Sequence, residues 1–318
     1  MKAVVVGGGS WGTAFSLLLA DRGHEVTLAA RDPDQVRAMR ETRRNPRYLT
    51  ELSLESVTPA TIDDAPIAGA DVVVLAVPSR AFGSVVRALP GDAPVLSLTK
   101  GLDPETGERL STLVTDRPVA VLSGPNMAEE IAHGLPTAAA IASEDVALAE
   151  RLQAEINSLA FRVYVNRDLV GVELCAAAKN VIALAAGGVD GLGLGDNAKA
   201  AVITRGLSEM ARLGEACGAQ PDTFAGLTGL GDLIVTCWHP SGRNRKAGEL
   251  IARGHTPEEA VAEIGQTVEG LTTAPVLRDL SRRLGIELPI TDGVCTILSG
   301  TSLSDLVVEL MGRRPREE

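Results

Sequence analysis

The chain opens with Lys2-Ala3-Val4-Val5-Val6-Gly7-Gly8-Gly9-Ser10-Trp11-Gly12, an apolar run that leads directly into a glycine-rich segment. The run Lys2–Gly7 predicts a short buried strand, and the segment Gly12–Asp21 predicts a helix. Gly7, Gly9 and Gly12 have the G-x-G-x-x-G spacing. Between a strand and a helix this spacing is typical of a turn that holds a pyrophosphate at the helix N-terminus. The opening therefore predicts a Rossmann-type dinucleotide-binding unit.

Strand-like and helix-like segments alternate through the rest of the first half. Continuous Val, Leu and Ala runs are expected where both faces of a parallel sheet are covered, so the alternation predicts a doubly wound, mostly parallel sheet. The predicted strands are Lys2–Gly7, Glu25–Ala30, Asp71–Val77, Val95–Thr99 and Val119–Ser123, with Pro136–Ala142 and Arg162–Val165 as added edge strands. The predicted helices are Gly12–Asp21, Asp34–Arg43, Ser79–Leu89, Gly107–Val114 and Asp145–Ser158.

From Asp168 onward the strand pattern ends and helical patterns separated by glycine-rich connections follow. The predicted helices here are Glu173–Ala186, Asn197–Cys217, Ala247–Arg253, Pro257–Ile264, Ala274–Leu284 and Pro289–Ser299. The fold class is therefore α/β plus all-α. We expect a Rossmann domain at 1–166 and a helical substrate-binding and catalytic domain at 167–318.

Charge and composition exclude several classes of protein. Of the 318 residues, 30 are Lys or Arg and 41 are Asp or Glu, which gives a formal net charge of −11. Such a chain lacks the positive field of a nucleic-acid or anionic-membrane binder, so an anionic ligand needs a local cluster of cations. The most apolar later stretch carries Glu173, Lys179 and Asp190 and several glycines, which argues against stable membrane insertion.

The cysteines and the N-terminus bear on metal binding and location. The four cysteines form no CxxC pair and no zinc-ligand spacing, so no metal is expected and a reducing cytoplasm fits. The N-terminal residues enter a strand at once, which leaves no room for a signal peptide. We therefore expect a cytoplasmic location.

One lysine lies in the stretch Leu174–Ala186 of a predicted helix, which is otherwise almost wholly apolar. The neighbours of Lys179 one turn away are Cys175, Ala176, Ile182 and Ala183, none of which neutralises an ammonium group. Desolvation would lower the pKa of this lysine and make it a usable proton carrier, whereas a nearby acid or a bound phosphate would raise the pKa again. The alternative is a lysine whose head group reaches water along the apolar surface.

Polar and glycine-rich segments elsewhere predict the rest of a site. The segment Gly226–Asp232 closes on an acid, and Ser241–Lys246 places three cations and an amide in six residues. This basic turn is either a local anion site or a solvated surface turn. Lys100-Gly101 and Gly124-Pro125-Asn126 each follow a predicted strand, where open α/β sheets bind ligands.

The end of the second strand bears on the choice of dinucleotide. An NAD site usually carries Asp or Glu there, whereas this chain has Arg31 followed by Asp32. A guanidinium can hold a 2′-phosphate through paired hydrogen bonds, so we expect NADP(H) to be preferred and NAD(H) to be possible. The alternative is an exposed arginine paired to a neighbouring acid.

Together these motifs resemble the bacterial NAD(P)-dependent glycerol-3-phosphate dehydrogenase family over essentially the whole chain. The motifs that carry the resemblance are Gly7–Thr13, Lys100-Gly101, Gly124–Ala128, Gly134–Ala138, Lys179-Asn180, Gly226–Asp232, Arg243-Asn244 and Val268-Glu269-Gly270.

The resemblance implies roles for individual residues. Lys179 would be the catalytic proton donor and acceptor. The substrate would contact Lys100, Gly124, Asn126, Lys179, Asp232, Gly242, Arg243 and Asn244, the last two holding its phosphate. The cofactor would contact Gly7, Gly9, Ser10, Trp11, Gly12, Arg31, Lys100, Ala128, Arg243, Thr267 and Glu269. This chain departs from the family at Asn126, where Ser or Thr is frequent, and at Gly242, where Ser is frequent and where we expect the backbone N–H to donate instead.

The resemblance also implies reversible NAD(P)H-dependent reduction of dihydroxyacetone phosphate to sn-glycerol 3-phosphate, a supply of glycerophospholipid precursor, and a homodimer. One alternative is a related helical-domain dehydrogenase of a hydroxy acid or a ketopantoate-type substrate. Another is a non-catalytic nucleotide sensor, which would need Gly7–Gly12 but neither Lys179 nor Asp232. A methyltransferase is disfavoured, because Arg31 replaces the acid that would bind the adenosine ribose.

Overall fold

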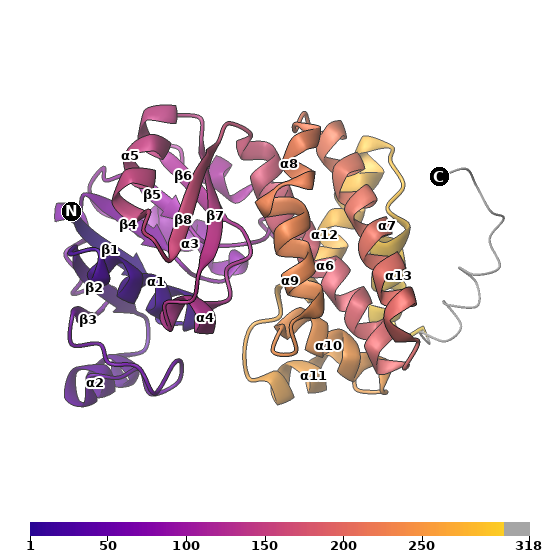
Figure 1. Cartoon of the computed structure of the whole chain (residues 1–318), viewed down its shortest axis with the longest axis horizontal. Helices are drawn as coiled ribbons and strands as arrows, with labels where there is room; N and C mark the ends of the chain where they lie inside the picture. The colour runs from indigo at the N-terminus through magenta and orange to yellow at the C-terminus, as the bar shows by residue number, and fades with distance from the viewer. Residues whose placement is uncertain (302–318) are drawn as a thin grey trace.

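The first half of the chain is built around one eight-stranded sheet. The computed structural model describes residues 1–301, so the end of the predicted helical domain (302–318) lies outside the described residues. The strand order is β3-β2-β1-β4-β5-β6-β7-β8, and all neighbours are parallel except β6 and β7 (Figure 1). The strands are β1 Lys2–Val6, β2 Glu25–Ala30, β3 Val57–Thr61, β4 Val72–Leu75, β5 Val95–Ser97, β6 Val119–Ser123, β7 Thr137–Ser143 and β8 Phe161–Asn166.

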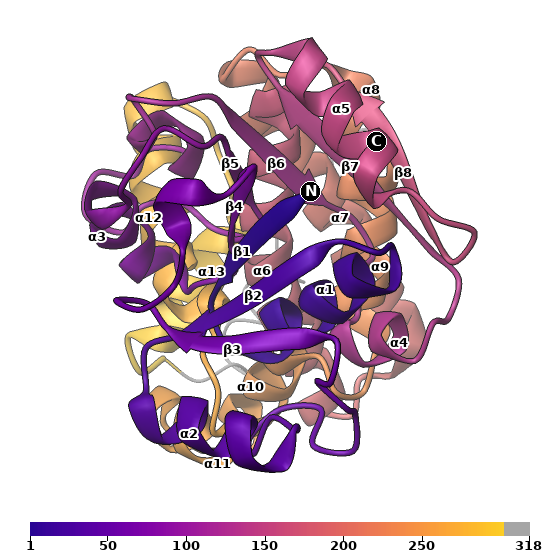
Figure 2. The same cartoon turned by 90° about the vertical axis from the view of Figure 1, so that its left-hand side faces the viewer.

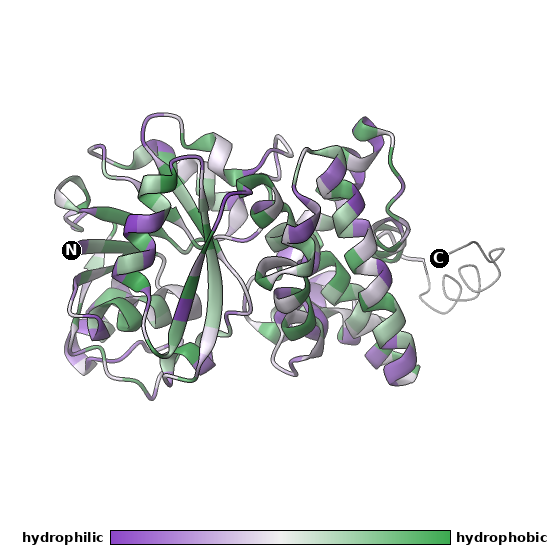
Figure 3. Ribbon diagram, turned by 45° about the horizontal axis from the view of Figure 1, so that its top comes forward, coloured by the Kyte–Doolittle hydropathy of each residue, from purple (hydrophilic) through white to green (hydrophobic). Residues whose placement is uncertain are grey.

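Helices cover both faces of this sheet. They are α1 Ser10–Asp21, α2 Pro33–Thr42, α3 Ser79–Ala88, α4 Ala128–Ala132 and α5 Val146–Ile156, with 3₁₀ turns η1 Ile67–Gly69 and η2 Leu110–Leu113. One apolar cluster joins Phe15 and Leu19 of α1 to Leu28 of β2, and a second joins Phe82 of α3 to Leu75 of β4. Figure 3 shows the corresponding band of hydrophobic residues along the strands. The predicted doubly wound, mostly parallel sheet is confirmed.

The strand order reverses beside β1. The chain runs from β1 through α1 to β2 on one side, whereas β4 pairs with β1 on the other side. Ligands of open α/β sheets bind beyond the carboxyl ends of the strands at such a reversal. The glycine-rich segment that follows β1 therefore lies at the position where a dinucleotide would bind.

The structure of this half differs from the sequence predictions at three places, one of which is the short helix α4, which was not predicted. β3 was not predicted, because it is short and contains Pro59, a residue that sheets tolerate at an edge. Figure 2 shows β3 at the edge of the sheet beside α2. The predicted helix Gly107–Val114 is wrong, since only the short turn η2 forms there. The buried Glu173 carboxylate accepts hydrogen bonds from the Ser111 N–H at 2.8 Å and from its hydroxyl at 2.6 Å, which ties this segment to the second half of the chain.

The second half is helical throughout its described residues. Its helices are α6 Leu169–Gly191, α7 Gly195–Ala216, α8 Pro221–Ala225, α9 Asp232–Trp238, α10 Arg243–Ala252, α11 Pro257–Ile264, α12 Glu269–Leu284 and α13 Pro289–Leu298, with a π-helical turn η3 at Leu227–Gly231. Among residues 1–301, α6 alone is long and apolar enough to cross a membrane, but 89% of its apolar window is buried inside the fold. α6 is thus the core helix of this half.

Helix α10 packs unusually closely on α6 because glycines lie at the contact. A Cβ atom on Gly187 would lie 1.8 Å from the carbonyl oxygen of Arg245, and one on Gly248 would lie 2.0 Å from that of Leu184. Neither position has room for a side chain. This approach brings the basic turn at the start of α10 against the helix that carries Lys179.

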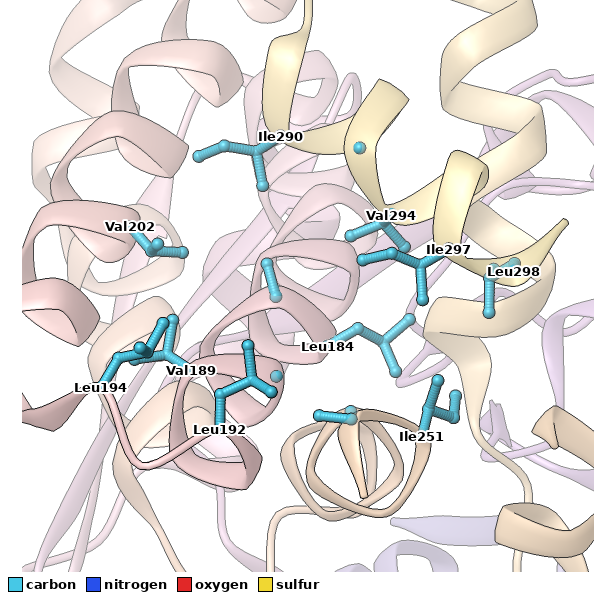
Figure 4. Close-up of a pocket in the computed structure, with 15 residues that line it drawn as sticks. Leu184, Val189, Leu192, Leu194, Val202, Ile251, Ile290, Val294, Ile297 and Leu298 are labelled. Atoms are coloured by element: carbon cyan, nitrogen blue, oxygen red, sulfur yellow. The ribbon is translucent and has the colours of Figure 1, made fainter. Parts of the chain in front are cut away.

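An apolar cavity lies between α6, α7, α10 and α13 (Figure 4). Its walls are formed by aliphatic side chains such as Leu184, Val189 and Ile297, together with glycines. Among residues 1–301, no titratable or hydroxyl group lines it. The cavity offers nothing for proton transfer or phosphate binding, so the chemistry lies elsewhere.

Candidate active site

Three segments far apart in the sequence meet at one buried carboxylate. The Asp232 Oδ1 atom accepts a hydrogen bond from Lys179 Nζ at 2.7 Å, and Oδ2 accepts one from Lys100 Nζ at 2.7 Å. Lys100 also donates to the carbonyl oxygen of Gly124 at 3.0 Å. Lys100 and Gly124 follow β5 and β6, so this cluster lies at the carboxyl ends of the strands, facing α6 and α9.

Lys179 is more deeply buried than Lys100. Its side chain is 6% exposed, against 17% for Lys100. Burial lowers the pKa of Lys179 to about 8; the Asp232 charge opposes this change and the Lys100 charge adds to it. The expectation of a desolvated lysine with a lowered pKa agrees with this environment. The acid that partly restores the pKa comes from α9, outside the helix that carries Lys179.

Asp232 is ionised despite its burial. Burial alone would raise the pKa of this carboxyl, but the two ammonium groups outweigh that effect and hold the pKa below its ordinary value. A buried carboxylate is stable only when it is paired and hydrogen-bonded in this way. Asp232 therefore fixes the positions of both ammonium groups.

Thr236 belongs to this cluster, and sequence reasoning missed it. Its hydroxyl oxygen accepts a hydrogen bond from Lys179 Nζ at 2.7 Å. Thr236 lies one helical turn after Asp232, so both face Lys179 from α9. The sequence signal was the i, i+4 pair of polar residues, but the helix α9 was not predicted because it is short and follows the glycine-rich segment Gly226–Gly231.

The basic turn Ser241–Lys246 contributes one arginine, Arg243, without a partner among the described residues, and one amide, Asn244, that is already hydrogen-bonded. Arg243 is exposed in the first turn of α10 and forms no hydrogen bond or ion pair with another described residue. Asn244 is buried: its Nδ2 donates to Asn180 Oδ1 at 2.9 Å, and its Oδ1 accepts from the Gly270 N–H at 2.8 Å. Asn244 thus links α10 to α6 and α12 and keeps one N–H of its amide for a ligand.

The backbone N–H of Gly242 does not have the free donor role that we expected. It donates to the carbonyl oxygen of His239 at 3.0 Å, closing the turn before α10. Asn126 is different, because its Oδ1 is buried and has no hydrogen-bond partner among residues 1–301. Its Nδ2 makes only a long contact of 3.4 Å with the Ala138 carbonyl. An unpaired buried acceptor beside Gly124 is suited to a ligand hydroxyl.

The glycine-rich loop has the shape that a pyrophosphate requires. Gly7 has φ +128°, which favours glycine, and a Cβ atom on Gly12 would lie 1.9 Å from the Gly7 carbonyl oxygen. The α1 N-terminus has no side-chain cap and no acidic residue in its first turn. Nothing lies within 4 Å of a Cβ built on Gly9, so its open side is free for a ligand. These features fit NAD(P) binding, with the phosphates at the α1 N-terminus.

The other expected cofactor residues lie on both halves of the chain. Arg31 is exposed at the end of β2 and has no ion pair within 1–301, whereas Trp11 Nε1 is buried without a partner. Ala128 begins α4, and Thr267 is half-buried just before α12. Glu269 crosses between the halves, since it accepts from the Ser79 N–H at 3.2 Å and from the Ser79 hydroxyl at 2.6 Å.

The Rossmann sheet, the open glycine loop and a buried lysine–carboxylate pair at the carboxyl ends of the strands define an NAD(P)-dependent dehydrogenase with a helical second half. Sequence comparison agrees. The family models for the N-terminus and the C-terminus of NAD-dependent glycerol-3-phosphate dehydrogenase match residues 2–149 and 168–309. The chain therefore belongs to the glycerol-3-phosphate dehydrogenase family.

Similar proteins support this family and the fold. The chain is 46% identical to a glycerol-3-phosphate dehydrogenase [NAD(P)+] of Moorella thermoacetica, over 98% of this chain and 96% of that protein. A crystal structure of glycerol-3-phosphate dehydrogenase from Coxiella burnetii has a TM-score of 0.94 at 38% identity, covering 98% and 99% of the two chains. A ketopantoate reductase from Ralstonia eutropha has a TM-score of 0.62 at 22% identity, covering 94% and 97%, and shares the fold alone.

Proposed function

We propose that this protein catalyses the reversible NAD(P)H-dependent reduction of dihydroxyacetone phosphate to sn-glycerol 3-phosphate, which supplies a precursor for glycerophospholipids. The observation that carries the proposal is the pairing of Lys179 and Lys100 on Asp232, at the carboxyl ends of the strands. Family membership and the names of the relatives support the reaction.

Lys179 is the proposed acid and base. A lysine ammonium has three N–H groups, and two are engaged by Asp232 and Thr236. The third is available for the carbonyl oxygen of the substrate. NAD(P)H, when bound, supplies the hydride that the carbonyl carbon accepts. Lys179 stabilises the negative charge that develops on the oxygen, then transfers a proton to it and becomes a neutral amine. In the oxidation direction the neutral amine takes the proton from the hydroxyl group.

Asp232 and Lys100 hold this arrangement. Asp232 fixes the Lys179 side chain and maintains enough of the ammonium form near neutral pH. Lys100 presents a second positive charge beside the same carboxylate, on the side of Gly124 and Asn126. We propose that Lys100 contacts both the substrate oxygen and the cofactor, and that Gly124 and Asn126 form the neighbouring wall.

The substrate phosphate is proposed to bind Arg243 and the remaining N–H of Asn244. Arg243 is an exposed cation with no ion-pair partner among the described residues, in a chain of net charge −11. A guanidinium binds a phosphate group through paired hydrogen bonds. Because Asn244 is bonded to Asn180, next to Lys179, phosphate binding at α10 is coupled to the position of the catalytic lysine.

The preference for NADP(H) is proposed from Arg31, which is exposed at the end of β2 and forms no ion pair with any residue of 1–301. The remaining cofactor contacts are proposed at the glycine loop (Gly7, Gly9, Ser10, Trp11 and Gly12), at Ala128, and at Arg243, Thr267 and Glu269.

We further propose that 1–166 binds the dinucleotide, that 167–318 binds the substrate, and that the protein is a metal-independent, cytoplasmic homodimer.

Nicotinamide absorbance tests the reaction directly. Purified protein is mixed with NADPH or NADH, with and without dihydroxyacetone phosphate, and with ketopantoate and a 2-oxo acid in parallel. We expect oxidation that requires dihydroxyacetone phosphate and is faster with NADPH. Oxidation with ketopantoate alone would contradict the substrate, and cofactor binding without any turnover would support the nucleotide-sensor alternative.

A further inference from the structure

The segment after α2 is fastened to the glycine-rich loop by one buried side chain. Asn45 has no exposed surface, and its Nδ2 donates to the Gly8 carbonyl at 3.1 Å and to the Thr13 hydroxyl at 2.9 Å. Its Oδ1 accepts from Gln35 Nε2 and from the Arg47 N–H, both at 3.1 Å. The backbone of Arg47 is therefore held in a fixed position relative to the dinucleotide loop.

Arg47 meets the acid that follows β2. One Nη atom of Arg47 forms a hydrogen-bonded ion pair with Asp32 Oδ2. The other oxygen, Oδ1, accepts from the Asp34 N–H at 2.9 Å and caps α2. Both carboxylate oxygens are engaged. In NAD-binding Rossmann folds an acid near this place accepts the adenosine ribose hydroxyls. Here the acid is turned to the helix and to Arg47 instead.

The local charge depends on Arg47. Arg31, Asp32 and Arg47 together carry one net positive charge, whereas Arg31 and Asp32 without Arg47 carry none. The Arg47 side chain is 54% exposed. The one ion pair that Arg47 forms within the described part of the chain engages a single Nη atom, so other N–H groups of the guanidinium are open to solvent there. A bound 2′-phosphate would lie beside the end of β2, where these groups are.

We propose that Arg47 is a second determinant of dinucleotide preference: it neutralises Asp32 and, with Arg31, forms the cationic subsite for the adenosine 2′-phosphate. This inference rests on the proposed preference for NADP(H) and adds a residue that sequence motifs did not point to. A role in stability alone would be small, because an exposed ion pair contributes little to folding.

Binding measurements without the second substrate test this subsite. Dissociation constants of NADPH, NADH, adenosine 2′,5′-bisphosphate and 5′-AMP are measured by calorimetry on the full chain. For Arg47→Ala we expect the affinity for NADPH and for the bisphosphate to fall about tenfold or more, since a charge-assisted contact is lost and Asp32 is left unneutralised. The affinity for NADH and 5′-AMP should stay within about twofold or improve. The matched control is Arg37→Ala, which removes an exposed arginine paired to Asp34 at 2.8 Å on α2.

A double variant separates the two parts of the role. In the Arg47→Ala background, Asp32→Asn should restore part of the NADPH affinity, because it removes the freed carboxylate. Equal losses for NADPH and NADH, or no loss in either, would overturn the inference. Arg31→Ala is measured in parallel. If Arg31→Ala loses the preference for NADPH but Arg47→Ala keeps it, the proposed role of Arg47 is rejected while that of Arg31 stands. If the wild-type protein prefers NADH, the underlying preference for NADP(H) is rejected.

Discussion

The pH dependence of the reaction provides the sharpest test of the Lys179–Asp232–Lys100 cluster. Reduction of the carbonyl needs Lys179 protonated, and burial lowers the pKa of this lysine to about 8. We expect kcat/KM for dihydroxyacetone phosphate to be level below this pH and to fall about tenfold for each pH unit above it. Oxidation of glycerol 3-phosphate needs the neutral amine and should rise through the same pH. A lysine with an ordinary pKa would leave reduction level until about pH 10.

Two substitutions should move this pKa in opposite directions. Asp232 raises the pKa of Lys179 and Lys100 lowers it. Asp232→Asn should therefore shift the break in kcat/KM to lower pH, and Lys100→Met should shift it to higher pH. Lys179 Nζ lies 2.7 Å from the Asp232 oxygen. Two unit charges at about this separation, with an effective dielectric constant of about 20, interact by about 6 kcal/mol, and each ~1.4 kcal/mol changes a pKa by about one. Since solvation of the variant site offsets part of this energy, we expect a downward move of roughly one to two pH units for Asp232→Asn.

The assay is kcat/KM with saturating cofactor from about pH 6 to about pH 10 at constant ionic strength, in both directions. Both variants will be less active, because both residues contact the site, but the pH of the break does not depend on the absolute value of kcat/KM. A wild-type profile that is level to about pH 10 would refute the desolvated lysine. Breaks that move in the same direction in the two variants would refute the electrostatic argument.

Three further changes test catalysis, phosphate binding and packing. Lys179→Ala should lower kcat by a factor of about 10² to 10⁴ while calorimetry shows unchanged dinucleotide affinity; unchanged turnover would reject the assignment. Arg243→Ala should raise KM for the phosphorylated substrate and lower kcat/KM by about tenfold or more, and unaltered values would exclude its role. Gly248→Ala should reduce the free energy of unfolding by about 1–3 kcal/mol, read as a lower Tm, because its Cβ would lie 2.0 Å from the Leu184 carbonyl oxygen. Gly69→Ala, whose Cβ meets open space, is its control and should leave the Tm nearly unchanged.

The sequence predicted most of the sheet because its signals are local. Buried parallel strands are continuous apolar runs, and the glycines after β1 are required by close backbone contacts that nothing else tolerates. The same local reasoning identified Lys179, since an ammonium surrounded by alanines is anomalous in any fold. It failed where tertiary contacts override local preference. β3 contains Pro59, and Glu173 pulls the segment around Ser111 into a 3₁₀ turn.

Which charges meet was decided by the tertiary structure. Asp232 lies 53 residues from Lys179 and 132 from Lys100 in the sequence, and no periodicity links positions so far apart. The resemblance to a family suggested that Lys179, Lys100 and Asp232 all contact the substrate, but the sharing of the two Asp232 oxygens by two lysines appeared only in the folded chain. Likewise, Arg31 predicted the dinucleotide preference from the sequence, and only the fold showed that the neighbouring Asp32 is paired with Arg47.

The residues alone thus determined that a dinucleotide loop and a desolvated lysine are present, because glycine spacing and an apolar helix face are properties of short segments. Only the folded chain decided how the lysine is held, which amide of the basic turn is already bonded, and which cation neutralises Asp32. The physical reason is that ion pairs and hydrogen bonds form between whichever groups packing brings within about 3 Å, whatever their separation along the chain.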